Sequence, residues 1–250
     1  MKTNAALNQS RRRFLRTAAA GASLALAGLP FAARAAGGTA GKMNIGVIGS
    51  GRVGGTVGEL WVKAGHEVMF SSLDLEHDKA LAARLGAGAR AGTSREATAF
   101  GEVLFFAVPY AALPQLGRDL ADGLKGKIVL DACNPIPGRD GDMAIEARAK
   151  GTGIASPQLL PGARLVRAFN CVSYMSMKSE AHRAGERLGI PLAGDDAAAV
   201  QLAVRLVRDA GFEPVVVGGL ARARDFDYGT PIFGRAMTAA EVRRTLGISS

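Results

Sequence analysis

The sequence predicts an α/β fold with an open, mostly parallel sheet that helices cover on both faces. Strand-like and helix-like segments alternate from Met43 almost to Val217. The strand-like segments are apolar runs, which are typical of strands buried on both faces. The first of them leads into Gly49-Ser50-Gly51-Arg52-Val53-Gly54, which opens a helix. These three observations together favour a doubly wound sheet.

The segment 49–54, which we call the phosphate loop, has the glycine spacing of a dinucleotide-binding turn. A strand predicted at 43–48 precedes it, and a helix predicted at 53–64 follows. Gly49 permits the tight turn, Gly51 lets the backbone approach a pyrophosphate, and Gly54 lets the helix pack closely. The helix N-terminus then faces the phosphates. All six residues are therefore predicted to bind the cofactor; the alternative is a glycine-rich turn without a ligand.

The remaining elements follow from apolar periodicity and from turn residues. Strands are predicted at 67–71, 102–108, 127–131, 163–169, 190–193 and 213–217, and helices at 76–85, 94–97, 111–124 and 197–210. Residues 86–92 are predicted as a loop, in which a short strand is left open. The segment 132–138 holds two prolines and a glycine, which favours an ordered loop over a helix. A short capped helix is expected near Ser156.

Residues 1–35 contain the three parts of an export signal in their usual order. Ser10-Arg11-Arg12-Arg13-Phe14-Leu15-Arg16 is basic, an Ala, Gly and Leu-rich run follows, and Ala33-Arg34-Ala35 offers a cleavage site. The paired arginines before Phe-Leu are similar to a twin-arginine signal. We expect residues 1–35 to be read by the twin-arginine export machinery, 36–42 to be a linker, and the mature protein to be periplasmic. The alternative is a basic, disordered arm.

The charge of the chain is concentrated in this predicted signal. The full sequence has a net charge of +9, but six of its 31 basic residues and no acid lie within residues 1–35. The remainder has 25 basic against 22 acidic residues, so it is near +3. Nucleic acid is therefore not an expected partner. The mature part also lacks an apolar run of about 18 residues, so no membrane span is expected there.

In sheets of this kind the ligand lies at the carboxyl ends of the strands, where the strand order reverses. The predicted cofactor-binding residues at those ends are Ser71, Ser72, Asp74, Ala107, Val108, Pro109 and Asn134. Asp74 would bind the ribose diol of NAD, whereas Ser71 and Ser72 with Arg52 could hold the 2′-phosphate of NADP. Asp74 could equally be the N-cap of the next helix. Both cofactors stay open.

Two further loops offer contacts to the nicotinamide end of a cofactor. The strand that ends at Val108-Pro109 leaves carbonyl groups facing the crevice, unless it is a simple strand stop. The side chain of Asn134 can donate and accept at once, as a nicotinamide carboxamide does; the alternative is a structural Asn. Cys133 and Cys171 follow the two strands predicted at 127–131 and 163–169. They could form a disulfide, but buried free thiols are favoured.

No proton donor is apparent in the sequence, so the catalytic residues are unknown. The three histidines are scattered and have no metal-ligand spacing with a cysteine, so no metal site is expected. A cofactor site without an evident acid indicates direct hydride transfer, in which the protein fixes the geometry and the cofactor performs the chemistry.

The chain resembles the oxidoreductases named for NADP and the deazaflavin coenzyme F420, whose dinucleotide domain also occurs in STEAP metalloreductases and, more distantly, in pyrroline-5-carboxylate reductase. The matching stretches are residues 45–54, Gly65-His66-Glu67-Val68, Val108-Pro109, Asn134-Pro135, 166–170 and Gly194-Asp195-Asp196. The resemblance implies a Rossmann-type domain over 43–250 with a small C-terminal cover at about 218–250. It also implies that the phosphate loop, Val108 and Pro109 contact the cofactor.

The resemblance implies a 2′-phosphate site of the form Ser-Arg-Arg after the second strand. Here Ser72 is present, while Leu73 and Asp74 stand in the arginine positions, so NADP is favoured over NAD only slightly. We expect an exported NAD(P)-dependent oxidoreductase that transfers hydride between a bound nicotinamide cofactor and coenzyme F420, a flavin or a similar small redox acceptor. The alternative is a non-catalytic dinucleotide-binding module that senses redox state or binds a partner. A homodimer is left open.

Overall fold

The computed structural model describes residues 41–249. The predicted signal peptide, residues 1–35, therefore lies outside the described residues, as does the predicted linker up to residue 40. No helix in the described part of the chain is long and apolar enough to cross a membrane.

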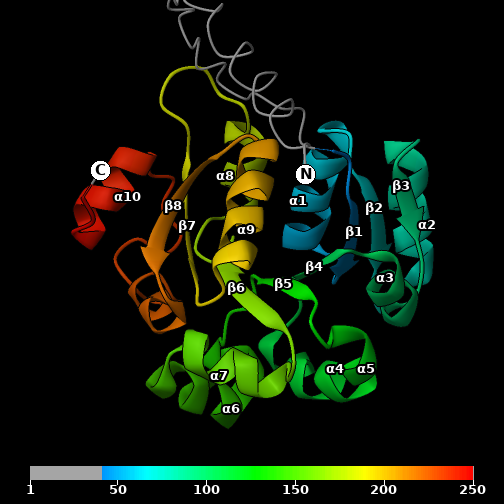
Figure 1. Ribbon diagram of the computed structural model, residues 1–250, viewed down its shortest axis with the longest axis horizontal. Helices are drawn as coiled ribbons and strands as arrows, with labels where there is room; N and C mark the ends of the chain where they lie inside the picture. The colour runs from blue at the N-terminus through cyan, green and yellow to red at the C-terminus, as the bar shows by residue number, and fades with distance from the viewer. Residues whose placement is uncertain (1–40, 250) are drawn as a thin grey trace, which may run out of the picture. The chain divides into compact units, whose positions relative to one another are not determined.

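The described residues form one eight-stranded sheet in the order β3-β2-β1-β4-β5-β6-β7-β8 (Figure 1). The strands are β1 (Asn44–Ile48), β2 (Glu67–Ser71), β3 (Ala89–Ala91), β4 (Val103–Phe106), β5 (Ile128–Asp131), β6 (Arg164–Ala168), β7 (Gly189–Gly194) and β8 (Glu213–Gly218). Only the β6–β7 pair within these residues is antiparallel. The predicted mostly parallel sheet is confirmed. The chain reverses direction across the sheet between β1 and β4, which is where such folds bind ligands.

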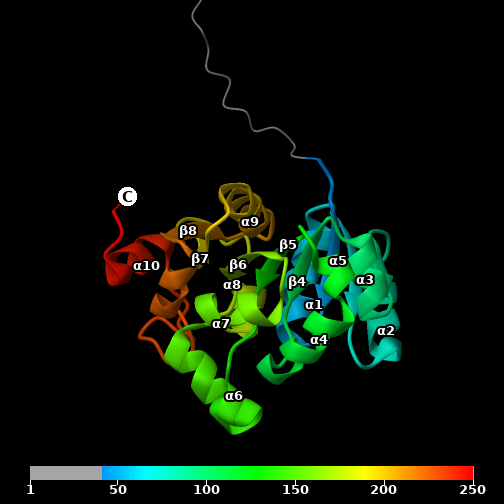
Figure 2. The same cartoon turned by 60° about the horizontal axis from the view of Figure 1, so that its bottom comes forward.

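Helices cover both faces of this sheet. They are α1 (Arg52–Lys63), α2 (Leu75–Leu85), α3 (Ser94–Phe100), η1 (Tyr110–Ala112), α4 (Leu113–Asp119), α5 (Ala121–Leu124), α6 (Pro137–Lys150), α7 (Thr152–Leu159), α8 (Tyr174–Glu180), α9 (Ala197–Asp209), η2 (Leu220–Asp225) and α10 (Ala239–Leu246), where η marks a 3-10 helix. Helices α1 and α9 pack on one face, and α3, α4, α5 and α7 pack on the other (Figures 1 and 2).

The apolar strand runs follow from burial on both faces. In β4, Val103 and Phe105 join the apolar cluster under α1 and α9, while Leu104 and Phe106 join the cluster on the opposite face. Because successive side chains of a strand point to opposite faces, a strand covered on both must be apolar at every position. Burial on both faces therefore explains why β4 is a continuous apolar run.

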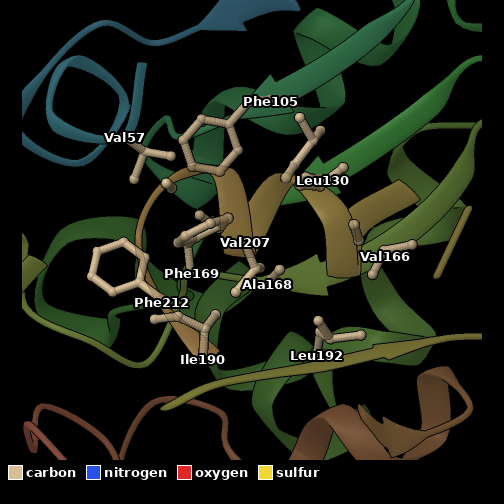
Figure 3. Close-up of a cluster of buried hydrophobic side chains, with 14 of the residues drawn as sticks. Val57, Phe105, Leu130, Val166, Ala168, Phe169, Ile190, Leu192, Val207 and Phe212 are labelled. Atoms are coloured by element: carbon tan, nitrogen blue, oxygen red, sulfur yellow. The ribbon is translucent and has the colours of Figure 1, made fainter. Parts of the chain in front are cut away.

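The centre of the first cluster is aromatic. The ring of Trp61 on α1 lies edge-on to Phe105 at 5.1 Å and to Phe169 at 5.9 Å between centroids. Its indole N–H donates to the Leu206 carbonyl of α9 at 2.8 Å. Figure 3 shows Phe105 and Phe169 meeting Val57 of α1 and Val207 of α9 in this cluster. These contacts join α1 to α9 and to the sheet, so the helix that begins at the phosphate loop is held rigidly.

Several helical segments differ from the prediction. The helix expected at 111–124 begins with the 3-10 turn η1 and is then divided into α4 and α5 at Leu120, which leaves helical geometry (φ −109°) while both Leu120 and Leu124 remain buried. Packing overrides helical propensity there. Helix α6 begins at Pro137, inside the segment expected to be a loop; proline suits a first helical position because its missing N–H has no intrahelical acceptor. Helices α8 and α10 and the 3-10 helix η2 have no counterpart among the predicted helices.

The residues that follow β8 pack back onto the sheet. Helix α10 lies against β7 and β8 (Figure 1), and Leu188 forms an isolated antiparallel bridge with Thr238. Thr238 caps α10 and forms a capping box with Glu241. Between η2 and α10, the chain passes the ends of β5 and β6, where it contributes to the site described next.

Candidate dinucleotide-binding site

The phosphate loop is fixed by backbone hydrogen bonds to the end of β2. The N–H groups of Gly49 and Ser50 both donate to the carbonyl of Ser71, at 2.8 and 3.0 Å. Gly49 has φ +99°, and a Cβ atom there would lie 2.6 Å from the carbonyl oxygen of Ala107. Only glycine meets both conditions, so the tight turn inferred from the sequence has this physical basis.

Gly54 and Gly51 serve opposite purposes in the loop. A Cβ at Gly54 would lie 1.8 Å from the carbonyl oxygen of Gly49, so its absence lets α1 pack against the loop. Gly51 is the exposed N-cap of α1 with φ −64°, and a Cβ there would meet nothing within 4 Å. No side chain caps α1. The amides of its first turn, including those of Arg52 and Val53, are thus available to an anion that approaches over Gly51.

Arg52 lies at the mouth of a groove of about 480 Å³ beside the loop. The groove runs between α1, α2 and α8, and its lining includes His77, Tyr174 and Lys178. The guanidinium of Arg52 lies over the ring of Tyr174 at 5.6 Å. Cations beside an uncapped helix N-terminus make this region attractive to phosphate groups.

A buried carboxylate that the sequence analysis missed organises the serines of this region. Asp78 on α2 is fully buried and accepts hydrogen bonds from the hydroxyl groups of Ser50 and of Ser72, the latter at 2.9 Å. Ser71 is also fully buried, and its hydroxyl donates to the Val47 carbonyl at 2.8 Å. Asp78 stands 24 residues after Gly54, a spacing close to that of the acid that binds ribose in such folds, so the sequence held a signal for it. Asp74 lies closer to the end of β2 and was predicted for this role instead.

Asp74 is the N-cap of α2. Its carboxylate accepts from the backbone N–H of His77 at 3.0 Å and is exposed to solvent, as is the neighbouring side chain of Leu73. The structure thus shows the capping role that was one of the two alternatives for this residue. Contact with a cofactor ribose stays a prediction.

The chain that leaves β4 lines the other side of the phosphate loop. The N–H of Ala107 donates to the Ile48 carbonyl at 2.9 Å, which carries the sheet ladder up to the loop. A Cβ at Gly49 would lie 2.7 Å from the Val108 side chain, so that side chain contacts the turn directly. Pro109 follows on the exposed side. The fold therefore brings Ala107, Val108 and Pro109 to the phosphate loop, at the point where the strand order reverses.

Asn134 pairs with Asn170 across the ends of β5 and β6. Its side-chain amide donates to the Asn170 carbonyl at 2.7 Å, and the amide of Asn170 donates to the Phe226 carbonyl at 3.2 Å. The side-chain oxygen of Asn170 is buried and accepts no hydrogen bond from residues 41–249. Phe169, just before it, has φ +62°, which is unusual for a residue with a side chain. Such backbone geometry is typical of functional sites.

A buried charge cluster lies behind this pair. Arg167 and Asp131 are fully buried, and Arg167 Nη1 lies 2.7 Å from Asp131 Oδ2 in an ion pair whose geometry is not that of a hydrogen bond. Arg167 also donates to the Cys133 carbonyl at 2.8 Å and lies 3.4 Å from Asp227. Burial acts to lower the pKa of Arg167, but the two carboxylates outweigh it and hold that pKa above its ordinary value. Thr152 completes the cluster by donating to Asp227 through its N–H and its hydroxyl.

Both cysteines are buried free thiols, as the sequence favoured. Burial raises the pKa of Cys171 to about 12 and raises the pKa of Cys133 well above its ordinary value. Thiols with such pKa values are poor nucleophiles near neutral pH. Within residues 41–249 no group of three His, Cys, Asp or Glu side chains is arranged to hold a metal ion.

Comparison with known proteins shows what this chain is similar to. Residues 44–135 match the family model described as NADP oxidoreductase coenzyme F420-dependent. The chain is 29% identical over 186 residues to the metalloreductase STEAP3 of Rattus norvegicus. That alignment covers 73% of this chain and 35% of STEAP3, so the chain spans about a third of the length of that relative.

Solved structures share the fold. A hypothetical protein from Sinorhizobium meliloti has a TM-score of 0.67 and 24% identity, over 79% of this chain and 96% of its own. A putative F420-dependent NADP reductase from Arthrobacter sp. has a TM-score of 0.59 and 22% identity, and the match covers 73% of this chain and 87% of that protein. An imine reductase from Myxococcus stipitatus, solved in complex with NAD+, has a TM-score of 0.56 and 19% identity, and the match covers 83% of this chain and 62% of that protein. These likenesses confirm the Rossmann-type α/β fold.

Proposed function

We propose that this protein is an exported NAD(P)-dependent oxidoreductase, because residues 44–135 match the family model described as NADP oxidoreductase coenzyme F420-dependent. In this proposal a nicotinamide dinucleotide binds across the carboxyl edge of β1 and β4, and hydride passes to a small acceptor of the deazaflavin or flavin type. The observation that carries the proposal is the phosphate loop, in which Gly51 leaves open space in front of an uncapped helix N-terminus.

The residues present fit such a cofactor. The first-turn amides of α1 would hold the pyrophosphate, residues 107–109 would line the path of the dinucleotide, and Asn134 would face the nicotinamide carboxamide at the end of β5. The bound dinucleotide would supply or accept the hydride. The protein's contribution is then orientation, through a loop fixed to β2 and an amide pair fixed to the C-terminal segment.

A second pocket supports an acceptor that carries negative charge. It has a volume of about 440 Å³ and lies between α6 and the segment after η2, with Arg148, Arg224, Asp227 and Tyr228 among its lining residues. The guanidinium of Arg148 lies over the Tyr228 ring at 5.1 Å, and that ring packs edge-on against Phe233 at 5.0 Å. None of the ion pairs found within residues 41–249 uses Arg148 or Arg224. Deazaflavin and flavin coenzymes carry phosphate groups, which pair well with arginine.

This pocket adjoins the Asn134–Asn170 pair through the C-terminal segment. Asp227 lines the pocket and is also part of the buried charge cluster, while the preceding carbonyl of Phe226 accepts from Asn170. An acceptor whose charged part rests on the two arginines would therefore be anchored by the same segment that contacts the amide pair. This juxtaposition supports hydride transfer at the ends of β5 and β6.

The competing function is a dinucleotide-binding module without turnover. It is favoured by the chemistry of the groups that meet at the ends of β5 and β6. Asn134 and Asn170 are carboxamides, the two thiols have raised pKa values, and Asp131 is consumed in a buried ion pair. None of these groups is a ready general acid. Direct hydride transfer does not need a general acid, so a turnover measurement distinguishes the enzyme from the module.

The proposal is tested by titrating the purified protein with NADH and NADPH in a calorimeter, with two matched glycine variants. Gly51→Ala adds a methyl group in the space where phosphate would bind, and we expect the affinity for reduced nucleotide to fall by at least about tenfold. Gly138→Ala adds the same methyl group at another exposed site where a Cβ meets nothing within 4 Å. It should leave affinity unchanged, and both variants should unfold as the parent does.

Turnover is then measured as the loss of reduced-nicotinamide absorbance when coenzyme F420, a flavin or a ferric chelate is added to the loaded protein. Oxidation by one of these acceptors, reduced by glutamine substitution of Arg148 and Arg224, would support the oxidoreductase. Binding of nucleotide without oxidation by any of them would favour the module. A parent protein with no affinity for either nucleotide would overturn the proposed function.

Export is the second part of the proposal and rests on the sequence of residues 10–35. Arg11→Lys combined with Arg12→Lys keeps the positive charge but removes the paired arginines, so it should retain the precursor in the cytoplasm. Cell fractionation followed by immunoblotting measures this. Arg16→Lys is the matched control and should be exported and processed like the parent. Equal export of all three chains would contradict the twin-arginine route.

A further inference from the structure

We propose that this site binds NAD in preference to NADP, and that the buried carboxylate of Asp78 is the specificity-determining group. The inference rests on the proposed function, because it concerns which dinucleotide the phosphate loop receives. It departs from the cofactor for which the family is named. Its basis is the direction in which three serine hydroxyls donate their protons.

Each serine near the end of β2 already donates its proton into the protein. The hydroxyl of Ser50 donates to Asp78, and the hydroxyl of Ser72 donates to Asp78 at 2.9 Å or to the Asp74 backbone carbonyl at 3.1 Å, because these acceptors have no proton to give. The hydroxyl of Ser71 donates to the Val47 carbonyl at 2.8 Å. No serine proton is left to point at a ligand beside this loop.

The exposed part of the site therefore offers an acceptor. Ser50 and Ser71 are buried, with 1% and 0% of their surface exposed. Ser72 is half-buried; its oxygen accepts from the Asp74 N–H at 3.1 Å and has a second lone pair for a ligand. A ribose 2′-hydroxyl has a proton to donate and suits that oxygen. A 2′-phosphate is mostly a dianion near neutral pH, accepts hydrogen bonds, and has no such proton to offer. The hydrogen-bond pattern fits the ribose of NAD and opposes the phosphate of NADP.

The charges around the loop act in the same direction. Asp74, Glu76 and Asp78 all belong to the start of α2 or its cap, and the one lysine there, Lys79, already pairs with Glu76 at 2.8 Å. Leu73 is fully exposed and brings no charge. A phosphate dianion placed here would meet a carboxylate behind Ser72 and no free lysine or arginine on this turn.

The cations that could oppose this conclusion lie in the groove between α1, α2 and α8. Arg52 lies over the ring of Tyr174, and His77 and Lys178 line the same groove. Glu59 lines it too, paired with Lys63 at 2.7 Å. If the 2′-phosphate reached this groove, Arg52 and His77 would bind it and the preference would reverse. The measured preference therefore decides between the two arrangements.

The first measurement is the dissociation constant of each reduced nucleotide with the full-length protein, by calorimetry or by fluorescence of the bound nicotinamide. We expect NADH to bind at least about tenfold more tightly than NADPH. Equal binding, or tighter binding of NADPH, would overturn the inference while leaving the proposed oxidoreductase intact. Absence of binding by both nucleotides would overturn the inference and the proposed function together.

Two variants assign the effect to a residue. Asp78→Asn replaces the carboxylate by an amide that donates to one serine oxygen, which frees that hydroxyl proton to turn outward. The ratio of NADPH to NADH dissociation constants should fall by about tenfold, mainly through tighter NADPH binding. Asp122→Asn is the control, because it removes one carboxylate at an exposed position on α5. It should leave the ratio unchanged; a change with Asp122→Asn but not with Asp78→Asn would overturn the assignment.

Ser72→Ala keeps the test decisive if Asp78→Asn does not fold. It removes the exposed acceptor from a half-buried position, so it should weaken NADH binding by about threefold to tenfold and leave NADPH binding unchanged. Circular dichroism of each variant verifies the fold before titration. Equal weakening of both nucleotides by Ser72→Ala would show that the hydroxyl does not distinguish them, and the inference would fail.

Discussion

Arg167 of β6 and Asp131 of β5 form an ion pair at 2.7 Å in which both side chains are fully buried. The same guanidinium lies 3.4 Å from Asp227, which stands 60 residues further along the chain. Two central strands and the segment after η2 are thus joined at one buried charge. A buried charge that loses its partners is costly, so this cluster determines where the C-terminal segment rests beside the site.

Replacing Arg167 by methionine should therefore destabilise the protein strongly. Arg167→Met leaves the carboxylates of Asp131 and Asp227 without their cation, and we expect the free energy of unfolding to fall by about 3–5 kcal/mol. Urea unfolding measures the loss. Lys125→Gln is the control, since its pair with Asp122 is exposed on the surface and should leave the unfolding midpoint unchanged. Equal stability of Arg167→Met and the parent would contradict a structural role for the cluster.

Gly54→Ala should damage both the fold and the site. Its Cβ would lie 1.8 Å from the backbone oxygen of Gly49, so α1 must move away from the phosphate loop. We expect a loss of about 1–3 kcal/mol in unfolding free energy together with loss of nucleotide affinity. Gly51→Ala should lose affinity alone. If Gly54→Ala kept the parent's stability, the close packing of α1 on the loop would not be needed for the fold.

The two thiols should be unreactive in the native protein. Burial raises the pKa of Cys171 to about 12 and that of Cys133 well above 9, so both stay protonated at mildly alkaline pH. A thiol reagent at such pH should label neither cysteine in the folded protein and both in urea. Because both folded pKa values exceed the unfolded ones, stability should fall as the pH rises above 9. Rapid native labelling of one equivalent would contradict this burial.

His66 should make the protein less stable in mild acid. Burial lowers the pKa of His66 below 6.5, although its hydrogen bond to Asp209 opposes the shift. The folded state therefore favours neutral His66, and stability is lost as the pH falls below 6.5 because the unfolded state binds the proton more readily. Urea midpoints above and below this pH should differ less in His66→Gln than in the parent. His77→Gln, at an exposed position, should keep the parent's dependence; the reverse pattern would reject His66 as the cause.

Several elements were predictable because their signals are local. The glycines of the phosphate loop, the apolar run of β4 and the capping aspartate before α9 each act within a few residues of where they stand. The fold class and the first part of the site followed from such patterns. Helix α6 was missed for a local reason as well, because Pro137 and Gly138 are common in loops and proline also suits the first position of a helix.

The sequence by itself determined the sheet, the turn at residue 50 and the strand ends where a ligand would lie, since period and turn chemistry depend on neighbours along the chain. Only the tertiary structure decided which polar side chains meet. Asp78 of α2 accepts the hydroxyl proton of Ser50, which stands 28 residues before it, and Arg167 pairs with Asp131 and Asp227 from distant segments. Partners far apart in sequence leave no periodic trace, because folding alone brings their charges and hydroxyls within hydrogen-bonding distance.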